Sequence, residues 1–231
     1  MTTMDMRYAH DTFDLVIFDC DGVLVDSEII SCTSVADVLT RHGLETDVEY
    51  VMRQFLGRPA TAILLDYADR AKREPPSEFI PDWRSALFAR LRTELAPIDG
   101  VRSAIEATPL ARCVASSSDM ERLDISLSKT NLLDLFDGNI FSTTMVKNGK
   151  PAPDLFLLAA ERIGADPMRS LVIEDSVSGV RAAKAAGMTA VGFTGGSHYR
   201  VLDNTSGLVE AGADRILTEM ADLPLLLGYG R

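Results

Sequence analysis

The chain has 231 residues, 46% of them hydrophobic, which is enough for one large domain or for one domain that carries a smaller one. Its 34 Asp and Glu residues outnumber its 23 Lys and Arg residues, and the net charge of −11 argues against nucleic acid or an anionic membrane as a partner. Three cysteines without metal-type spacing, no run of membrane-spanning length and no apolar N-terminal stretch lead us to expect a cytoplasmic protein with reduced thiols.

The first expected strand is the apolar run 15–20, whose continuous hydrophobicity is typical of a strand buried in a parallel sheet. No convincing strand pattern then appears before residue 97. Helical patterns take its place, and the first of them is opened by Ser27 and closed by Gly43. We therefore expect an all-helical insert at 27–96. It interrupts a main domain formed by residues 13–26 and 97–231.

After residue 97 the pattern alternates between helix and strand. Expected strands cover residues 111–117, 138–144, 170–175, 189–194 and 214–218. Expected helices between the strands cover residues 100–108, 119–131, 153–164 and 176–187, with two more near the C-terminus. Such alternation with short connections predicts an α/β fold, a doubly wound parallel sheet that carries the helical insert.

Polar residues gather just after four of these strands, where a doubly wound sheet places its ligands. Asp19 and Asp21 follow the first strand, and if the strand continues locally both side chains project from the same side. The other clusters are "ASSSD", with Ser116 first, "KNGKPAPD", with Lys150, and "IEDSVSG", with Glu174 and Asp175. Carboxylates at this density predict a Mg²⁺ site, because Mg²⁺ prefers oxygen ligands and can bind a substrate phosphate together with a few protein carboxylates.

These groups suit phosphoryl transfer. Lys150, the Ser116 hydroxyl and backbone N–H groups near Gly22 can neutralise phosphoryl oxygens, and of the two serines that follow Ser116 we expect Ser117 to contribute as well. With that charge neutralised, Asp19 can attack phosphorus and form an aspartyl-phosphate. Asp21 can protonate the leaving alkoxide and later take a proton from the attacking water.

The chain resembles the haloacid dehalogenase-like phosphohydrolases, which have a Rossmann-like core, and the resemblance covers nearly its whole length. The four motifs are "FDCDGVLVD", Ser116 in "VASSS", Lys150 in "GKPAPD" and the pair Glu174–Asp175, in that order. The resemblance implies that Mg²⁺ is held by the Asp19 side chain, the Asp21 carbonyl and Asp175. It leaves Glu174 as a metal ligand or as a partner of one, and it makes the insert a cap domain.

Within this family the chain is similar to the β-phosphoglucomutase-like branch and to sugar-phosphate phosphatases such as 6-phosphogluconate phosphatase. We expect a small phosphorylated substrate and a cap that closes over it. Arg58 and Arg84 are candidate cationic contacts from the cap, with solvated helix-surface arginines as the alternative interpretation. A histidine used by the mutase falls here on Ser31, which favours hydrolysis over phosphate transfer between sugar positions.

Two other classes remain open. One is a sugar phosphomutase on the same scaffold, and the other is a phosphoaspartate receiver domain, which would be far shorter and would not need the insert.

Two further residue types receive no catalytic role. Cys20 is expected to pack as a small apolar residue, and the three histidines, His10, His42 and His198, show no ligand-type grouping.

Overall fold

The apolar runs form one parallel sheet, described here in a computed structural model that covers residues 8–9, 11–58 and 60–229. His10 and the last two residues of the expected main domain, 230–231, lie outside the described residues. The strands are β1 (Leu15–Phe18), β2 (Ala111–Ser116), β3 (Ile140–Ser142), β4 (Ser170–Glu174), β5 (Thr189–Phe193) and β6 (Arg215–Leu217). Their order is β3-β2-β1-β4-β5-β6 with every pair parallel, which confirms the predicted doubly wound α/β fold.

The order of the strands reverses beside β1. The chain runs from β1 through β2 to β3 at one edge and then returns to place β4 on the other side of β1. Phe18 is in register with Ile173, and the Asp19 amide donates to the Ile173 carbonyl at 3.0 Å. The residues that follow β1 and β4 are therefore neighbours at the switch point, where such sheets bind ligands.

Alternate residues of each strand serve opposite faces of the sheet. In β1, Val16 and Phe18 join one hydrophobic cluster, and Leu15 and Ile17 join the other. The first cluster includes residues of α5 (Val101–Glu106), α6 (Met120–Lys129) and α10 (Leu223–Leu226). The second includes residues of α7 (Asp154–Ile163), α8 (Val177–Ala185) and α9 (Thr205–Glu210). Helices thus bury both faces, which explains the unbroken hydrophobicity of the strands.

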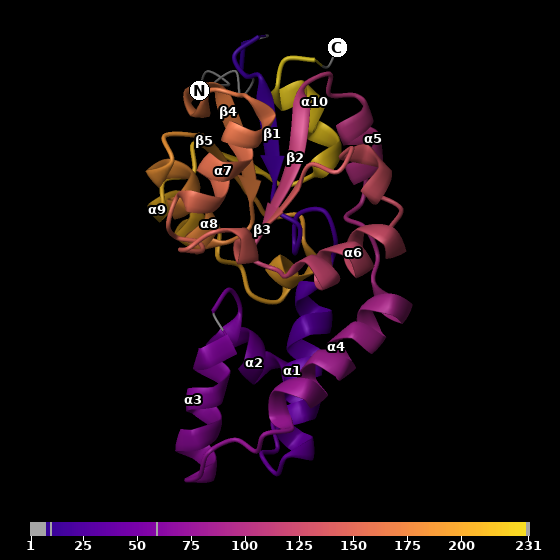
Figure 1. Ribbon diagram of the computed structural model, residues 1–231, viewed down its shortest axis with the longest axis vertical. Helices are drawn as coiled ribbons and strands as arrows, with labels where there is room; N and C mark the ends of the chain where they lie inside the picture. Colours follow the sequence, from indigo (N-terminus) through magenta and orange to yellow (C-terminus); the bar gives the residue numbers. More distant parts are fainter. Residues whose placement is uncertain (1–7, 10, 59, 230–231) are drawn as a thin grey trace.

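The segment between β1 and β2 contains the expected helices, and they extend away from the carboxyl end of the sheet (Figure 1). They are α1 (Glu28–Arg41), α2 (Val48–Phe55), α3 (Ala60–Ala71) and α4 (Phe79–Glu94). A hydrophobic cluster of their own includes Leu39, Met52 and Tyr67. We call residues 28–94 the helical insert.

Two connections join the helical insert to the sheet domain. Val25 forms an isolated bridge with Pro97, and the Ile98 amide donates to the Leu24 carbonyl at 2.9 Å, so the outgoing and returning chains lie side by side. The second half of α4 packs with the sheet domain, where Leu91 joins the cluster of Phe18. The predicted boundaries at 26/27 and 96/97 stay a prediction.

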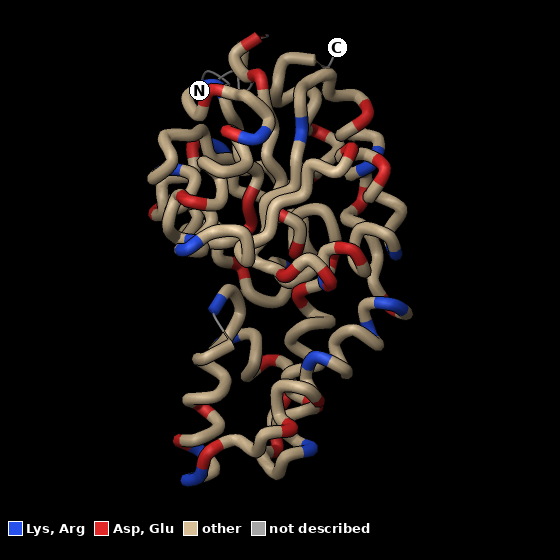
Figure 2. The backbone as a smooth tube through the Cα atoms, viewed as in Figure 1, with Lys and Arg blue, Asp and Glu red and all other residues tan. Residues whose placement is uncertain are grey.

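Acidic residues gather at the edge of the sheet domain that faces the helical insert (Figure 2). This edge is the carboxyl end of the strands, where the polar clusters were expected. Within the residues that the structure describes, no helix combines the length and the apolar character needed to cross a membrane. The cysteines Cys20, Cys32 and Cys113 are buried and unpaired, as expected for small packing residues.

Candidate active site

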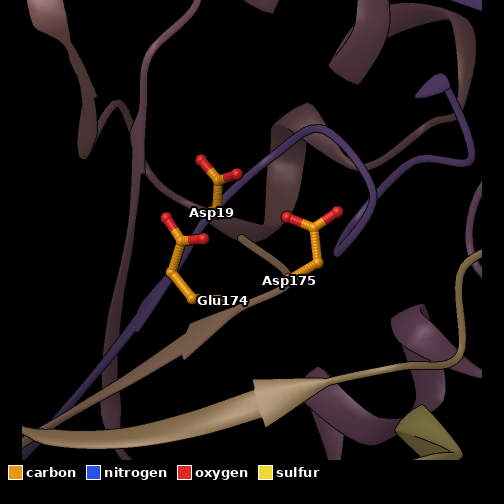
Figure 3. Close-up of side chains that lie close together, drawn as sticks. All are labelled: Asp19, Glu174 and Asp175. Carbon is orange, nitrogen blue, oxygen red and sulfur yellow. The ribbon is translucent and has the colours of Figure 1, made fainter. Parts of the chain in front are cut away.

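Three carboxylates meet where β1 and β4 end. Asp19 follows β1, Glu174 ends β4, and Asp175 is the next residue along the chain. Their side chains point in the same general direction, away from the strands (Figure 3). One oxygen of each lies within 4.8 Å of an oxygen of the others. The sheet register therefore builds the acidic cluster that the motif spacing predicted.

Lys150 reaches this cluster from the loop between β3 and α7. Its ammonium lies 2.9 Å from Asp19 Oδ1 and 2.5 Å from Glu174 Oε1, and it donates to the Ala115 carbonyl at 3.0 Å. Its side chain is only 2% exposed, so Lys150 is not a solvated loop lysine. Burial alone would lower the pKa of Lys150, but the charges of Asp19 and Glu174 raise it above its usual value.

Glu174 is fully buried and both of its oxygens have partners. Lys150 engages Oε1, while the amide and hydroxyl of Ser176 donate to Oε2 at 3.1 and 2.9 Å. Ser176 also caps α8 by accepting from the Gly179 amide. A Cβ on Gly179 would lie 1.8 Å from the Glu174 carboxyl carbon, so the cradle fits only glycine. These contacts let Glu174 orient Lys150, and the role of Glu174 as a metal ligand or as a partner of one stays a prediction.

The donor set fits a divalent cation. Lys150 engages only Oδ1 of Asp19, and His198 engages only Oδ2 of Asp175, so each carboxylate keeps a second oxygen for an ion. Burial, together with neighbouring carboxylates, raises the pKa of Asp19 and of Asp175 well above its usual value. Two such groups in one buried cluster need a cation to stay ionised, and oxygen donors suit Mg²⁺.

Asp21 has a separate set of partners. Ser27 and Ser118 each donate a hydroxyl to it at 2.6 Å, and Arg122 Nη2 donates to Oδ1 at 2.6 Å. Burial alone would raise the pKa of Asp21, but the Arg122 charge and the two hydroxyl bonds lower it. We call Ser27, Ser118 and Arg122 the Asp21 clamp.

The Asp21 clamp corrects two expectations. The strand ends at Phe18 instead of continuing through the aspartates, so strand alternation does not relate the two side chains. Asp19 contacts Lys150, whereas Asp21 contacts the Asp21 clamp. Ser27 does stand before α1, but its hydroxyl makes no cap bond because it donates to Asp21. Asp119, by contrast, accepts from the Arg122 amide and caps α6.

Gly22 lies where the chain turns beneath Asp175. Its φ of 75° is in the left-handed region, and a Cβ there would lie 1.9 Å from Asp175 Oδ2. Only glycine lets the backbone approach the Asp175 carboxylate this closely. The expected contribution of nearby N–H groups to phosphate binding stays a prediction.

The serines after β2 are divided among different contacts. Ser116 is buried, and its hydroxyl accepts from the Ser118 amide at 3.1 Å. Ser118, which we did not select, reaches Asp21, whereas Ser117 is exposed. Roles for Ser116 and Ser117 in phosphate binding stay predictions.

The two arginines expected to contact substrate lie in different surroundings. Arg58 is exposed, and it donates to the Gln54 carbonyl at 3.0 Å. The α2–α3 connection that carries it lies at the end of the helical insert nearest the sheet domain (Figure 1). Arg84 pairs with Asp119 at 2.6 Å and Glu121 at 2.7 Å, across the join between α4 and α6. Arg84 thus bridges the helical insert and the sheet domain, and its contact with substrate stays a prediction.

Sequence reasoning missed His198. It lies beyond the end of β5, is 3% exposed, and places Nε2 3.2 Å from Asp175 Oδ2. Ligand-type spacing was the wrong criterion for it, because its partner lies 23 positions away (198 − 175), after a different strand. The rule that groups residues after parallel strands could have found it. His42 instead contacts Asp82 in the helical insert at 3.0 Å.

Comparisons with known proteins cover most of this chain. The sequence model of the haloacid dehalogenase-like hydrolase family matches residues 16–193. A fructose-1-phosphate phosphatase of Escherichia coli K12 is 35% identical over 76% of this chain and 94% of its own length. A 6-phosphogluconate phosphatase of the same strain is 27% identical over 81% of this chain and 85% of its own.

A solved structure is similar over nearly the whole fold. It is a conserved haloacid dehalogenase-like protein of unknown function from Agrobacterium tumefaciens, 38% identical, with a TM-score of 0.82 over 93% of this chain and 97% of that one. The family match contains Asp19, Asp21, Lys150 and Asp175, whereas His198 lies beyond its end.

Proposed function

Because the chain belongs to the haloacid dehalogenase-like hydrolase family, we propose that it is a Mg²⁺-dependent phosphatase that acts on a small phosphorylated sugar or sugar acid. It is a phosphoric monoester hydrolase, in keeping with relatives that are named phosphatases. The observation that carries the proposal is the position of Asp19 at the switch point, 2.9 Å from the buried Lys150 ammonium and clustered with Asp175.

The residues divide the chemistry between two steps. In the first, an Asp19 oxygen forms a bond to phosphorus while the ester O–P bond breaks, and Asp21 gives a proton to the leaving alkoxide. In the second, water attacks phosphorus, Asp21 takes a proton from that water, and phosphate leaves Asp19. Lys150 faces the phosphoryl oxygens from a site that excludes water, which strengthens its effect.

Asp19, Asp175 and the Asp21 carbonyl would hold the metal, and bound Mg²⁺ would neutralise phosphoryl charge. The helical insert acts as a cap, with Arg58 as its candidate contact with the substrate. A cytoplasmic location remains our expectation.

Hydrolysis is favoured over the phosphomutase alternative. Ser31 stands in the fourth position of α1, where the mutase branch uses a histidine, and a serine cannot take up a proton near neutral pH. The receiver alternative is set aside, because the chain belongs to a hydrolase family.

Phosphate release from a panel of phosphorylated sugars, sugar acids and nucleotides tests the proposal. We expect release that depends on Mg²⁺, stops on chelation and is lost in Asp19→Asn, because an amide cannot attack phosphorus. Asp14→Asn is the matched control, since Asp14 precedes the same strand at its far end and pairs there with Arg169. Turnover by Asp19→Asn near the wild-type rate would contradict the nucleophile. Efficient conversion of β-glucose 1-phosphate to glucose 6-phosphate would favour the mutase.

A further inference from the structure

Three consecutive residues beyond β5 each contact an acidic residue or its backbone. Ser197 donates its amide and hydroxyl to Asp26 Oδ1 at 3.1 and 2.8 Å. His198 Nε2 lies 3.2 Å from Asp175 Oδ2, and the Tyr199 hydroxyl donates to the Asp175 carbonyl at 2.6 Å. We call Ser197–Tyr199 the Asp175 strap.

We propose that His198, assisted by Tyr199, is a positioning residue that fixes the Asp175 carboxylate for binding of the divalent cation. The inference rests on the proposed function, which makes Asp175 a metal ligand. The inference adds a residue outside the four motifs and gives it a role in strengthening metal binding.

The surroundings of Asp175 leave its side chain little freedom. Gly22 packs so closely that a Cβ there would lie 1.9 Å from Asp175 Oδ2 and 3.1 Å from His198 Cε1. His198 Nδ1 is buried and has no hydrogen-bond partner within the described residues, so the polar contact of the ring is the one to Asp175. With Oδ2 held in this way, Oδ1 is the oxygen left to face the ion.

This arrangement matters because Asp175 lies among like charges. Asp19 and Glu174 share its cluster, and repulsion between carboxylates favours rotation of the Asp175 side chain away from them. The His198 ring nitrogen, 3.2 Å from the outer oxygen, opposes that rotation before the ion arrives. Partners that orient metal ligands in this way commonly contribute about 10- to 100-fold to metal affinity.

The Asp175 strap also reaches the helical insert. Asp26, the acceptor for Ser197, stands two positions before α1 begins, and α1 packs against the 3₁₀ turn η4 (Ser197–Arg200). The segment that orients Asp175 is thus anchored on the chain that leads into the insert.

Calorimetric titration of the metal-free full chain with Mg²⁺ tests the inference without using activity. His198→Ala should weaken Mg²⁺ binding by about 10-fold or more. His198→Gln should recover part of the affinity, because the glutamine amide can donate a hydrogen bond to Asp175 Oδ2. Tyr199→Phe removes only a hydroxyl, so it should preserve the fold and weaken binding by a smaller factor.

His42→Ala is the matched control. It removes a histidine that contacts an aspartate through Nε2 at 3.0 Å, but in the helical insert, and it should leave Mg²⁺ affinity unchanged. Asp175→Asn should lose Mg²⁺ binding. If Asp175→Asn loses binding while His198→Ala and Tyr199→Phe bind within about twofold of wild type, the inference is overturned and the metal site stands. If Asp175→Asn binds Mg²⁺ as wild type does, the proposed metal site fails and the inference fails with it.

Discussion

Removal of the Lys150 ammonium is the sharpest test of how the site is held together. Lys150→Met keeps the length of the side chain but leaves Asp19 and Glu174 without the cation that lies 2.9 and 2.5 Å from them. Glu174 is fully buried and the Asp19 side chain is 11% exposed, so water cannot replace the lost partner. We expect the metal-free variant to be markedly less stable than wild type at neutral pH.

The size of the effect follows from the burial of the pair. Breaking a buried ion pair by removing one partner costs about 3–5 kcal/mol in the free energy of unfolding. For a chain of this size that loss lowers the Tm by about 10 °C. The pKa of Lys150 is raised in the folded state, so its contribution is fully present at neutral pH and is lost only at strongly alkaline pH.

Urea unfolding of the metal-free protein measures this cost. Lys150→Met combined with Glu174→Gln should recover about 1–3 kcal/mol relative to the single variant, because one of the two unpaired charges is gone. Lys147→Met is the control, since Lys147 lies exposed on the same loop. The reasoning would be refuted if the free energy of unfolding of Lys150→Met lay within about 1 kcal/mol of that of wild type, because breaking a buried pair usually costs well over that amount.

Two further predictions concern the groups around Asp21. Arg122→Met removes the charged donor that lowers the pKa of Asp21, so the pH–rate profile of sugar-phosphate hydrolysis, which needs a proton from Asp21, should move to higher pH, while that of p-nitrophenyl phosphate changes little; unchanged profiles on both substrates would contradict this role. Burial, followed by the charges of Asp175 and Asp21, raises the pKa of Glu28 from 4.5 to about 8, so folded Glu28 holds its proton more tightly than the unfolded chain does. The free energy of unfolding of the metal-free protein should therefore fall as the pH rises toward 8. Urea unfolding at pH 5 and pH 8 should show that Glu28→Gln removes about 1–2 kcal/mol of this fall. If wild type and Glu28→Gln lose the same free energy of unfolding between the two pH values, the idea is ruled out.

Local sequence determined the helices and strands of this fold and which residues form its acidic cluster. Continuous apolar runs mark strands buried on both faces, and the carboxyl ends of parallel strands meet at one edge of the sheet. Four residues could therefore be predicted to meet, because each lies at or beyond the carboxyl end of a strand in a doubly wound sheet: Asp19, Lys150, Glu174 and Asp175. The structure brings these four together.

Only the tertiary structure decided which partner each polar group takes. Ser27 looks like a helix cap in the sequence but donates to Asp21, and Arg84 looks like a substrate contact but pairs with Asp119 and Glu121. His198, beyond the last residue of the family match, reaches Asp175 from another loop. Hydrogen bonds form within about 3 Å, and a shift of one residue at a strand end redirects a side chain. Periodicity in the sequence places such groups at the right edge of the sheet, but their partners depend on how separate loops pack against one another.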